Sequence, residues 1–286
     1  MLEVFLTISV AYGLKRINLF TSASASVLVN YVIYFALPAV GFKYARELGF
    51  SKEVFSIALG AWLTILGCLL FAFLISGFMK LSSEKRRALA LLSAFGNTAF
   101  LGYPYTHAYF GSHGLKYAII YDQLGSFLLV SSVGFLIASG RLNPKEVLLF
   151  PPFLSLVLGF ASKNIELPQA LINFIDFVSL SLLPVVLFAL GLQLSFSKAF
   201  GELKLLTFVL FLKLLVSPLL AYIVFSFLPV DEVAKKVGIL ESGMPTMITA
   251  SLLAIRFGLE PNLAVASAGV GIIVSFITVP LLVRLI

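Results

Sequence analysis

Long apolar runs, separated by short polar or charged segments, follow one another along the whole chain. Their approximate bounds are 2–14, 24–42, 53–79, 88–110, 115–139, 146–162, 168–194, 203–228, 236–257 and 261–285. A membrane-spanning helix requires about 20 predominantly apolar residues, whereas a barrel strand would alternate over about ten. The pattern therefore predicts an all-α polytopic membrane protein with ten transmembrane helices.

The composition agrees with a lipid environment and removes several classes of function. Hydrophobic residues make up 60% of the chain and charged residues 12%, against about 45–50% and 25% in soluble proteins. One cysteine and two histidines exclude a disulfide framework and a Cys/His metal cluster. Because no nucleophile–base pair stands out either, we expect no enzyme activity and no cofactor.

Sequence matches recur at nearly one offset. Leu37–Phe42 resembles Leu183–Phe188 at an offset of 146, and Phe50–Lys52 matches Phe196–Lys198 at the same offset. Phe110-Gly111 matches Phe257-Gly258 at 147. The matches predict one membrane domain built from two halves, 1–141 with spans 1–5 and 142–286 with spans 6–10, and no soluble domain. Because five is odd, the halves must be inverted relative to each other, which is the plan of secondary transporters.

The charges between the runs predict an orientation. They fit lipid headgroups better than nucleic acid, because they occur in short blocks between apolar runs. With ten spans both termini lie on one side, whose loops and tail carry eight basic residues, while the opposite loops carry eleven: Lys15, Arg16, Lys80, Lys85, Arg86, Arg87, Arg141, Lys145, Lys198, Lys204 and Arg256. The positive-inside rule therefore predicts a multi-pass protein of the inner or plasma membrane with both termini outside the cytoplasm.

Helix-breaking residues gather in the fourth span of each half. The stretch from Phe95 to Pro104 contains two glycines and a proline, and Glu241–Met247 contains a glycine and a proline. A broken helix is tolerated in lipid where the freed backbone groups line a cavity or find partners. The alternative interpretation is that these glycines and prolines only form packing notches or mild kinks in continuous helices. We expect broken helices 4 and 9, with helix breaks at Gly102 and Pro104. The substrate-binding candidates are Gly96, Asn97, Thr98, Gly243, Pro245 and Thr246.

Three ionisable groups lie deep within apolar runs, where a charge is costly and usually functional. Asp122, beside Gln123, and Glu241 suggest a Na⁺ site or a proton relay for ion coupling. The structural alternatives are a lysine salt bridge for Asp122 and a hydrogen bond to the broken backbone for Glu241. Lys213 has three interpretations, namely snorkelling, pairing with a carboxylate, or contact with an anionic substrate.

Two motifs resemble known transporter families. Asn97–Pro104 resembles the N-T-x-x-x-G-x-P stretch of the auxin efflux carrier family. The resemblance implies ten helices in two inverted repeats, with a scaffold domain and a crossover domain in which the crossed broken helices 4 and 9 meet at the substrate site, and often a homodimer. Glu241–Met244 is similar to the E-x-G-M stretch of the bile acid:sodium symporters, which implies Na⁺ binding by Glu241 and Met244. This chain departs from each pattern at one position. The glutamine that follows the E-x-G-M stretch in the symporters is replaced by Pro245, and the proline that precedes Asn-Thr in plant auxin carriers is replaced by Gly96.

These observations together predict a secondary active transporter of small organic anions, carboxylates in particular, coupled to Na⁺ or H⁺ and working by alternating access. Asn97 and Thr98 would bind the substrate carboxylate, and no metal is expected apart from Na⁺ at Glu241. One alternative is a bile-acid-type sodium symporter. Another is a membrane receptor or sensor that keeps the transporter fold without translocation.

Overall fold

The computed structural model describes residues 2–140, 149, 151–193 and 203–286, and all regular structure in these ranges is helical. Short π-helical segments (η), in which the backbone bonds span five residues, interrupt several α-helices. The predicted boundary between the halves, the basic residues Arg141, Lys145 and Lys198, and the Phe196–Lys198 match lie outside the described residues.

In the first half the helices run from the N-terminus to Ser139. Their bounds are α1 (Leu2–Arg16), α2 (Ser22–Tyr31), η1 (Val32–Ala36), α3 (Leu37–Leu48), α4 (Lys52–Phe78), α5 (Ser83–Ala94), η2 (Thr98–Gly102), α6 (Tyr103–Ile120), η3 (Tyr121–Phe127), η4 (Val130–Gly134) and α7 (Phe135–Ser139). Within α6 the backbone turns sharply at Gly111, whose φ of 62° and ψ of −162° suit glycine best.

In the second half the described helices run from Pro151 to Leu285. Their bounds are α9 (Pro151–Ala161), α10 (Gln169–Leu180), α11 (Leu182–Gln193), α12 (Leu203–Phe211), η5 (Leu212–Val216), α13 (Ser217–Ser226), α14 (Glu232–Ser242), α15 (Ile248–Arg256) and α16 (Pro261–Leu285).

Six helical runs in the described ranges are long and apolar enough to cross a membrane. They are Ala23–Leu48, Lys52–Phe78, Thr98–Ser139, Gln169–Gln193, Leu203–Ser226 and Pro261–Leu285. Large apolar side chains such as Phe50, Phe78 and Phe177 are more than 70% exposed, as expected where the surrounding solvent is lipid. An integral, multi-pass, helical membrane protein is thereby supported, while the count of ten spans and the inverted repeat stay predictions.

Several helices begin earlier than the apolar runs that predicted them. α5 begins at Ser83 rather than near 88, because the Ser82 hydroxyl accepts a hydrogen bond from the Lys85 amide at 3.4 Å. α14 begins at Glu232 rather than near 236, because the Asp231 carboxylate accepts from the Ala234 amide at 2.7 Å. Such N-caps, and not hydropathy, determine where a helix starts.

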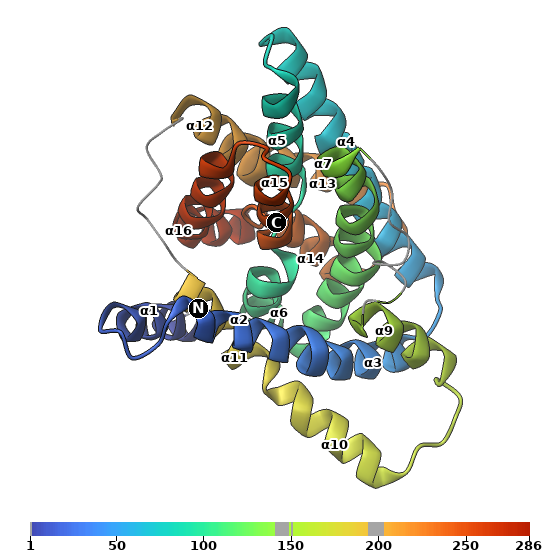
Figure 1. Cartoon of the computed structure of the whole chain (residues 1–286). Coiled ribbons are helices and arrows are strands. Elements are labelled where there is room, and N and C mark those ends of the chain that lie inside the picture. Colours follow the sequence, from blue (N-terminus) through green and yellow to red (C-terminus); the bar gives the residue numbers. More distant parts are fainter. Residues whose placement is uncertain (1, 141–148, 150, 194–202) are drawn as a thin grey trace.

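The helices pack in two groups (Figure 1). In one group α1 lies against α11, α3 lies against α9, and α10 packs on α3. In the other, α4 contacts α5 and α13, α13 contacts α14, and α15 contacts α16. Two interrupted runs, α5–η2–α6 and α14–α15, meet near the middle of the molecule, where α14 contacts α6 and η2.

Candidate functional site

The two interrupted helical runs meet where their backbones become extended. Between α5 and η2, and between α14 and α15, the chain forms an antiparallel bridge at Gly96 and Thr246. The Asn97 amide donates to the Pro245 carbonyl at 2.7 Å, and the Met247 amide donates to the Phe95 carbonyl at 2.9 Å. Backbone groups that lose their helical partners thus find each other, as burial within a membrane requires.

Two side chains reinforce the meeting point. The Thr246 hydroxyl donates to the Leu92 carbonyl at 2.8 Å, in the last turn of α5. Lys213 of η5, only 1% exposed, donates to the Ser242 carbonyl at 2.6 Å and to the Ser217 hydroxyl at 3.2 Å. Its ammonium group therefore lies at the C-terminal end of α14, where the helix dipole favours a positive charge.

The first interruption lies ahead of the residues expected to cause it. The non-helical segment is 95–97, whereas Gly102 has right-handed helical φ and ψ and Pro104 occupies the first turn of α6. In η2 the Gly102 amide donates to the Asn97 carbonyl and the Tyr103 amide to the Thr98 carbonyl. The wide π turn leads directly into the first turn of α6, which contains Pro104. Proline lacks an amide hydrogen, but in a first turn this lowers the stability of the helix little, because that amide would have no helical partner.

Asp122 lies in η3 with neutral hydrogen-bond donors. Its carboxylate, 2% exposed, accepts from the Thr98 hydroxyl, from the Tyr103 hydroxyl at 2.7 Å and from the Gln123 amide at 2.6 Å. Within the described part of the chain no ion pair to Asp122 is present, and the Gln123 carbonyl oxygen is buried without a hydrogen-bond partner. Asp122 therefore holds η3 to the start of η2 and α6.

Glu241 is fully buried near the end of α14, beside the other interrupted run. Its Oε1 accepts from the Thr106 hydroxyl of α6 at 2.7 Å, and among the described residues Oε2 has no partner. The carboxylate occupies the space next to Gly102, where any Cβ atom would overlap it. Met244 is also fully buried and packs with Leu101 and Leu240. Each buried carboxylate thus contacts the η2–α6 run.

A cavity of about 490 Å³ opens beside the meeting point. Its lining comes from α2, η1, η2, α11, α15 and α16, and the described lining residues carry no charged side chain. These residues are Ala25, Ser26, Val29, Asn30, Ile33, Phe100, Leu192, Gln193, Ile248, Thr249, Ser251, Leu252, Ile255, Val265, Ala268, Gly269 and Ile272. Ser251 is 4% exposed and its hydroxyl has no hydrogen-bond partner in the described chain. The six substrate-binding candidates do not line this cavity; they lie on the segments that lead to it.

Comparison with known proteins places the chain in a family. The sequence matches the family described as "Membrane transport protein" over residues 1–146 and 140–283. The chain belongs to this family, the auxin efflux carrier family of membrane transporters. It is 30% identical to an uncharacterized transporter of Methanothermobacter thermautotrophicus, covering 98% of this chain and 95% of the relative. It is also 30% identical to an uncharacterized transporter of Methanocaldococcus jannaschii, covering 93% and 91%. These names indicate membrane transport rather than catalysis.

Some residues at the site of this transporter were not foreseen. Tyr103 and Thr106 hold the two carboxylates, and Ser251 supplies a hydroxyl to the cavity. Thr106 lies four residues after Gly102, so the two share a helix face. That spacing was the sequence signal that could have identified Thr106 as a site residue. Ser251 carries no such signal, because a single serine in an apolar helix commonly bonds its own backbone.

Proposed function

We propose that the protein is a secondary transporter that moves small organic carboxylates by alternating access. The observation that carries the proposal is the cavity beside the paired extended segments, because transporters built from repeats bind substrate where helices are interrupted. Its volume of about 490 Å³ lies in the range of ligand pockets, about 300–1,000 Å³.

The lining supports an anion with an apolar body. Ile248 and Thr249, in the first turn of α15, line the cavity, and helix N-termini present amide donors and positive partial charge. The Ser251 hydroxyl, without a partner in the described chain, is an available donor in the cavity. The side-chain amide of Asn97, also without a partner there, lies outside the lining, in the segment that leads to it. Most of the other lining residues are aliphatic. This combination favours a carboxylate head with a hydrocarbon or aromatic body.

Ion coupling is assigned to the buried carboxylates. Asp122 and Glu241 both hold the η2–α6 run, through Thr98 and Tyr103 in one case and through Thr106 in the other. Adding H⁺ or Na⁺ to either carboxylate would change how firmly that run is held. Oε2 of Glu241 has no partner in the described chain, which favours binding of a cation there. Binding of Na⁺ at this oxygen would support the alternative proposal, a bile-acid-type sodium symporter.

Helix packing supports the inverted halves on which alternating access depends. Gly191 of α11 lies so close to α1 that its Cβ would come within 2.6 Å of the Ala11 Cβ. Gly159 of α9 lies as close to α3, at 2.8 Å from the Ala45 Cβ. Residues 45 and 191 differ by 146, the offset of the sequence repeat, and residues 11 and 159 differ by 148. The two close contacts are therefore related by nearly the same offset, which supports a repeat divided at 141/142.

Uptake into proteoliposomes, with Na⁺ and pH gradients imposed separately, tests transport and coupling together. We expect a carboxylate to accumulate with one gradient, and Asp122→Asn or Glu241→Gln to abolish that dependence. Ser251→Ala should raise the KM for substrate, whereas the control Ser267→Ala, whose hydroxyl bonds the Ala264 carbonyl of its own helix, should not. Gradient dependence that survives both carboxylate variants would refute the coupling assignment. Binding of carboxylates without any uptake would favour a receptor.

A further inference from the structure

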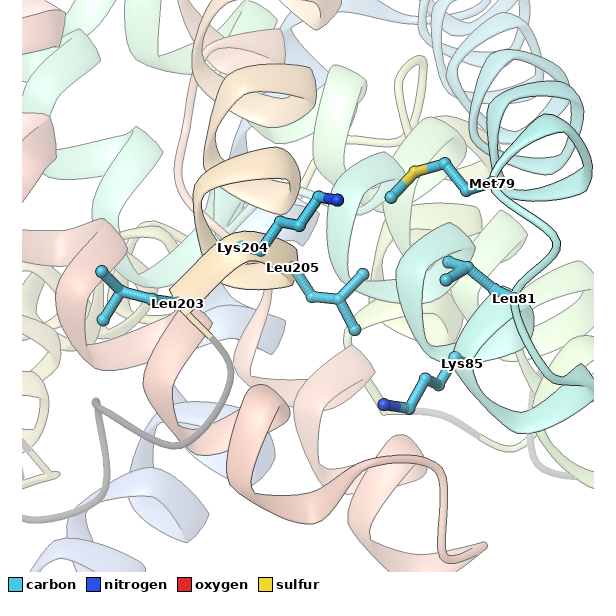
Figure 2. A pocket seen from close by; sticks show the side chains of 6 residues that line it. All are labelled: Met79, Leu81, Lys85, Leu203, Lys204 and Leu205. Carbon is cyan, nitrogen blue, oxygen red and sulfur yellow. The ribbon is translucent and has the colours of Figure 1, made fainter.

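A second cleft, of about 390 Å³, lies between the turn that joins α4 to α5 and the first turn of α12 (Figure 2). Met79, Leu81 and Lys85 form one wall, and Leu203, Lys204 and Leu205 form the other. Figure 2 shows the side chains of both lysines extending into the space between the walls. None of these six residues lines the cavity assigned to substrate, so the cleft is a separate feature.

The chemistry of the cleft is amphiphilic. Two ammonium groups accompany four apolar side chains, and no carboxylate is among its described lining residues. The Glu260 carboxylate lies 3.9 Å from the Lys85 ammonium, so among these described residues one negative charge stands against two positive ones. Arg86 and Arg87 follow Lys85 in α5 and add to the positive potential. A ligand for this cleft therefore combines an anionic head with a hydrocarbon part.

The cleft also lies at the ends of two candidate membrane spans, where lipid headgroups are expected. α4, a candidate membrane span, ends at Phe78, immediately before Met79, and the span Leu203–Ser226 begins at the opposite wall. Phe78 itself is 87% exposed, which is unfavourable unless hydrocarbon surrounds it. The ends of two spans thus border the lysines, which is where anionic headgroups meet basic side chains.

We propose that this cleft binds one anionic phospholipid, with its phosphate between Lys85 and Lys204 and its first hydrocarbon segment against Met79, Leu81, Leu203 and Leu205. The bound lipid would connect α5 with α12. Both helices lead to the meeting point, α5 through its C-terminal end and α12 through η5, which carries Lys213. Lipid composition would then influence how readily the transporter changes conformation.

The test is native mass spectrometry of the detergent-purified full chain titrated with phosphatidylglycerol or phosphatidylcholine of identical acyl chains. We expect one phosphatidylglycerol to bind in preference to phosphatidylcholine. Removing both charges, in Lys85→Gln with Lys204→Gln, should weaken its binding by roughly five-fold per lysine. The arginine pair, Lys85→Arg with Lys204→Arg, should retain the preference.

The matched control removes two lysines elsewhere, Lys52→Gln with Lys235→Gln. Lys52 lines another surface cleft with apolar walls, and Lys235 lies over the Tyr222 ring. Equal loss in the control pair would mean that net charge, and not this cleft, selects the lipid. Equal binding of the two lipids by the unaltered chain would overturn the proposal. Competition by millimolar inorganic phosphate would reassign the cleft to a soluble anion. Melting temperatures of all variants identify any that fail to fold. If the glutamine pair fails to fold, the arginine pair decides, because loss of the preference for phosphatidylglycerol in that pair would overturn the proposal.

Discussion

The carboxylate of Glu241 occupies the space beside Gly102 that a Cβ atom on residue 102 would fill. The buried acid and the glycine lie on different interrupted runs, and their contact fixes the distance between these runs. Coupling through Glu241, as proposed, requires that this contact be made and released as the cation binds and leaves.

Substituting Gly102→Ala should therefore damage both folding and transport. Overpacking of a buried site costs about 1–3 kcal/mol, and the displaced carboxylate would lose its bond to Thr106. The control is Gly13→Ala in α1, where a Cβ atom meets nothing within 4 Å, and where alanine favours the helix. We expect a lower melting temperature and loss of uptake only for the first variant, and normal uptake by Gly102→Ala would contradict the role of the contact.

Removing the hydroxyl in Thr106→Val should alter coupling more than binding. Oε1 of Glu241 would lose its donor, which costs about 1–3 kcal/mol for a buried group. Thr64→Val is the matched control, because the Thr64 hydroxyl bonds only the Gly60 carbonyl of its own helix. The measurement is the pH and Na⁺ dependence of uptake, which should shift for Thr106→Val and stay unchanged in the control. Identical shifts in both would reduce Thr106 to a packing role.

Lys213→Met should destabilise the meeting point. The Ser242 carbonyl, buried at the end of α14, would lose the ammonium group that it accepts from, at a cost of about 1–3 kcal/mol. The single cysteine, Cys68, is buried, so its reaction with a thiol-specific dye on heating reports unfolding. We expect reaction at a lower temperature than in the unaltered protein; an unchanged temperature would mean that the bond contributes nothing.

Asp231, in the loop before α14, should make stability depend on pH in the acid range. Partial burial raises the pKa of its carboxyl, but hydrogen bonds from the Tyr117 hydroxyl and from the Ala234 and Val233 amides outweigh this and hold the pKa below its ordinary value. The stabilisation is therefore complete above the unfolded pKa of about 4 and is lost as the pH falls through the lower folded value. Asp231→Ala should cost about 1 kcal/mol at neutral pH through loss of the N-cap.

The check is a series of melting temperatures for the unaltered protein and for Asp231→Ala. The difference between them should be constant near neutral pH and shrink below about pH 4. A difference that persists in strong acid would show that the cap does not depend on the ionised carboxylate.

The proposed orientation can be tested by labelling intact cells. In a Cys68→Ser background, Ser112→Cys lies on the side of the termini and Ser83→Cys on the opposite side, if ten spans are present. Both serines are exposed. A membrane-impermeant maleimide should label only Ser112→Cys when both termini face outward. Labelling of Ser83→Cys alone would reverse the orientation.

Sequence reasoning identified the membrane class and the buried acids because each leaves a local signal. Apolar runs stand out over about 20 residues, and isolated carboxylates such as Asp122 and Glu241 stand out within them, and both are indeed buried. The family membership that the Asn97–Pro104 motif suggested is confirmed. The roles assigned to these residues stay predictions.

The sequence could not supply the pairing itself. The bond from Asn97 to Pro245 joins residues from different halves, and no local pattern encodes which residues will meet. Gly102 and Pro104 were expected to break the helix, because their intrinsic propensities are poor. The interruption lies at 95–97 instead; it includes Gly96, which the sequence also singled out, and its backbone bonds go to the partner segment in place of helical ones.

The pairing of the extended segments has a consequence for how the protein is made. The Asn97 amide and the Phe95 carbonyl have their partners about 150 residues later in the chain. At roughly 5–20 residues per second, synthesis takes on the order of ten seconds to deliver them. During that time the Asn97 amide and the Phe95 carbonyl lack these partners. Until the second half arrives, both groups must therefore find other hydrogen bonds, within a helix or with water.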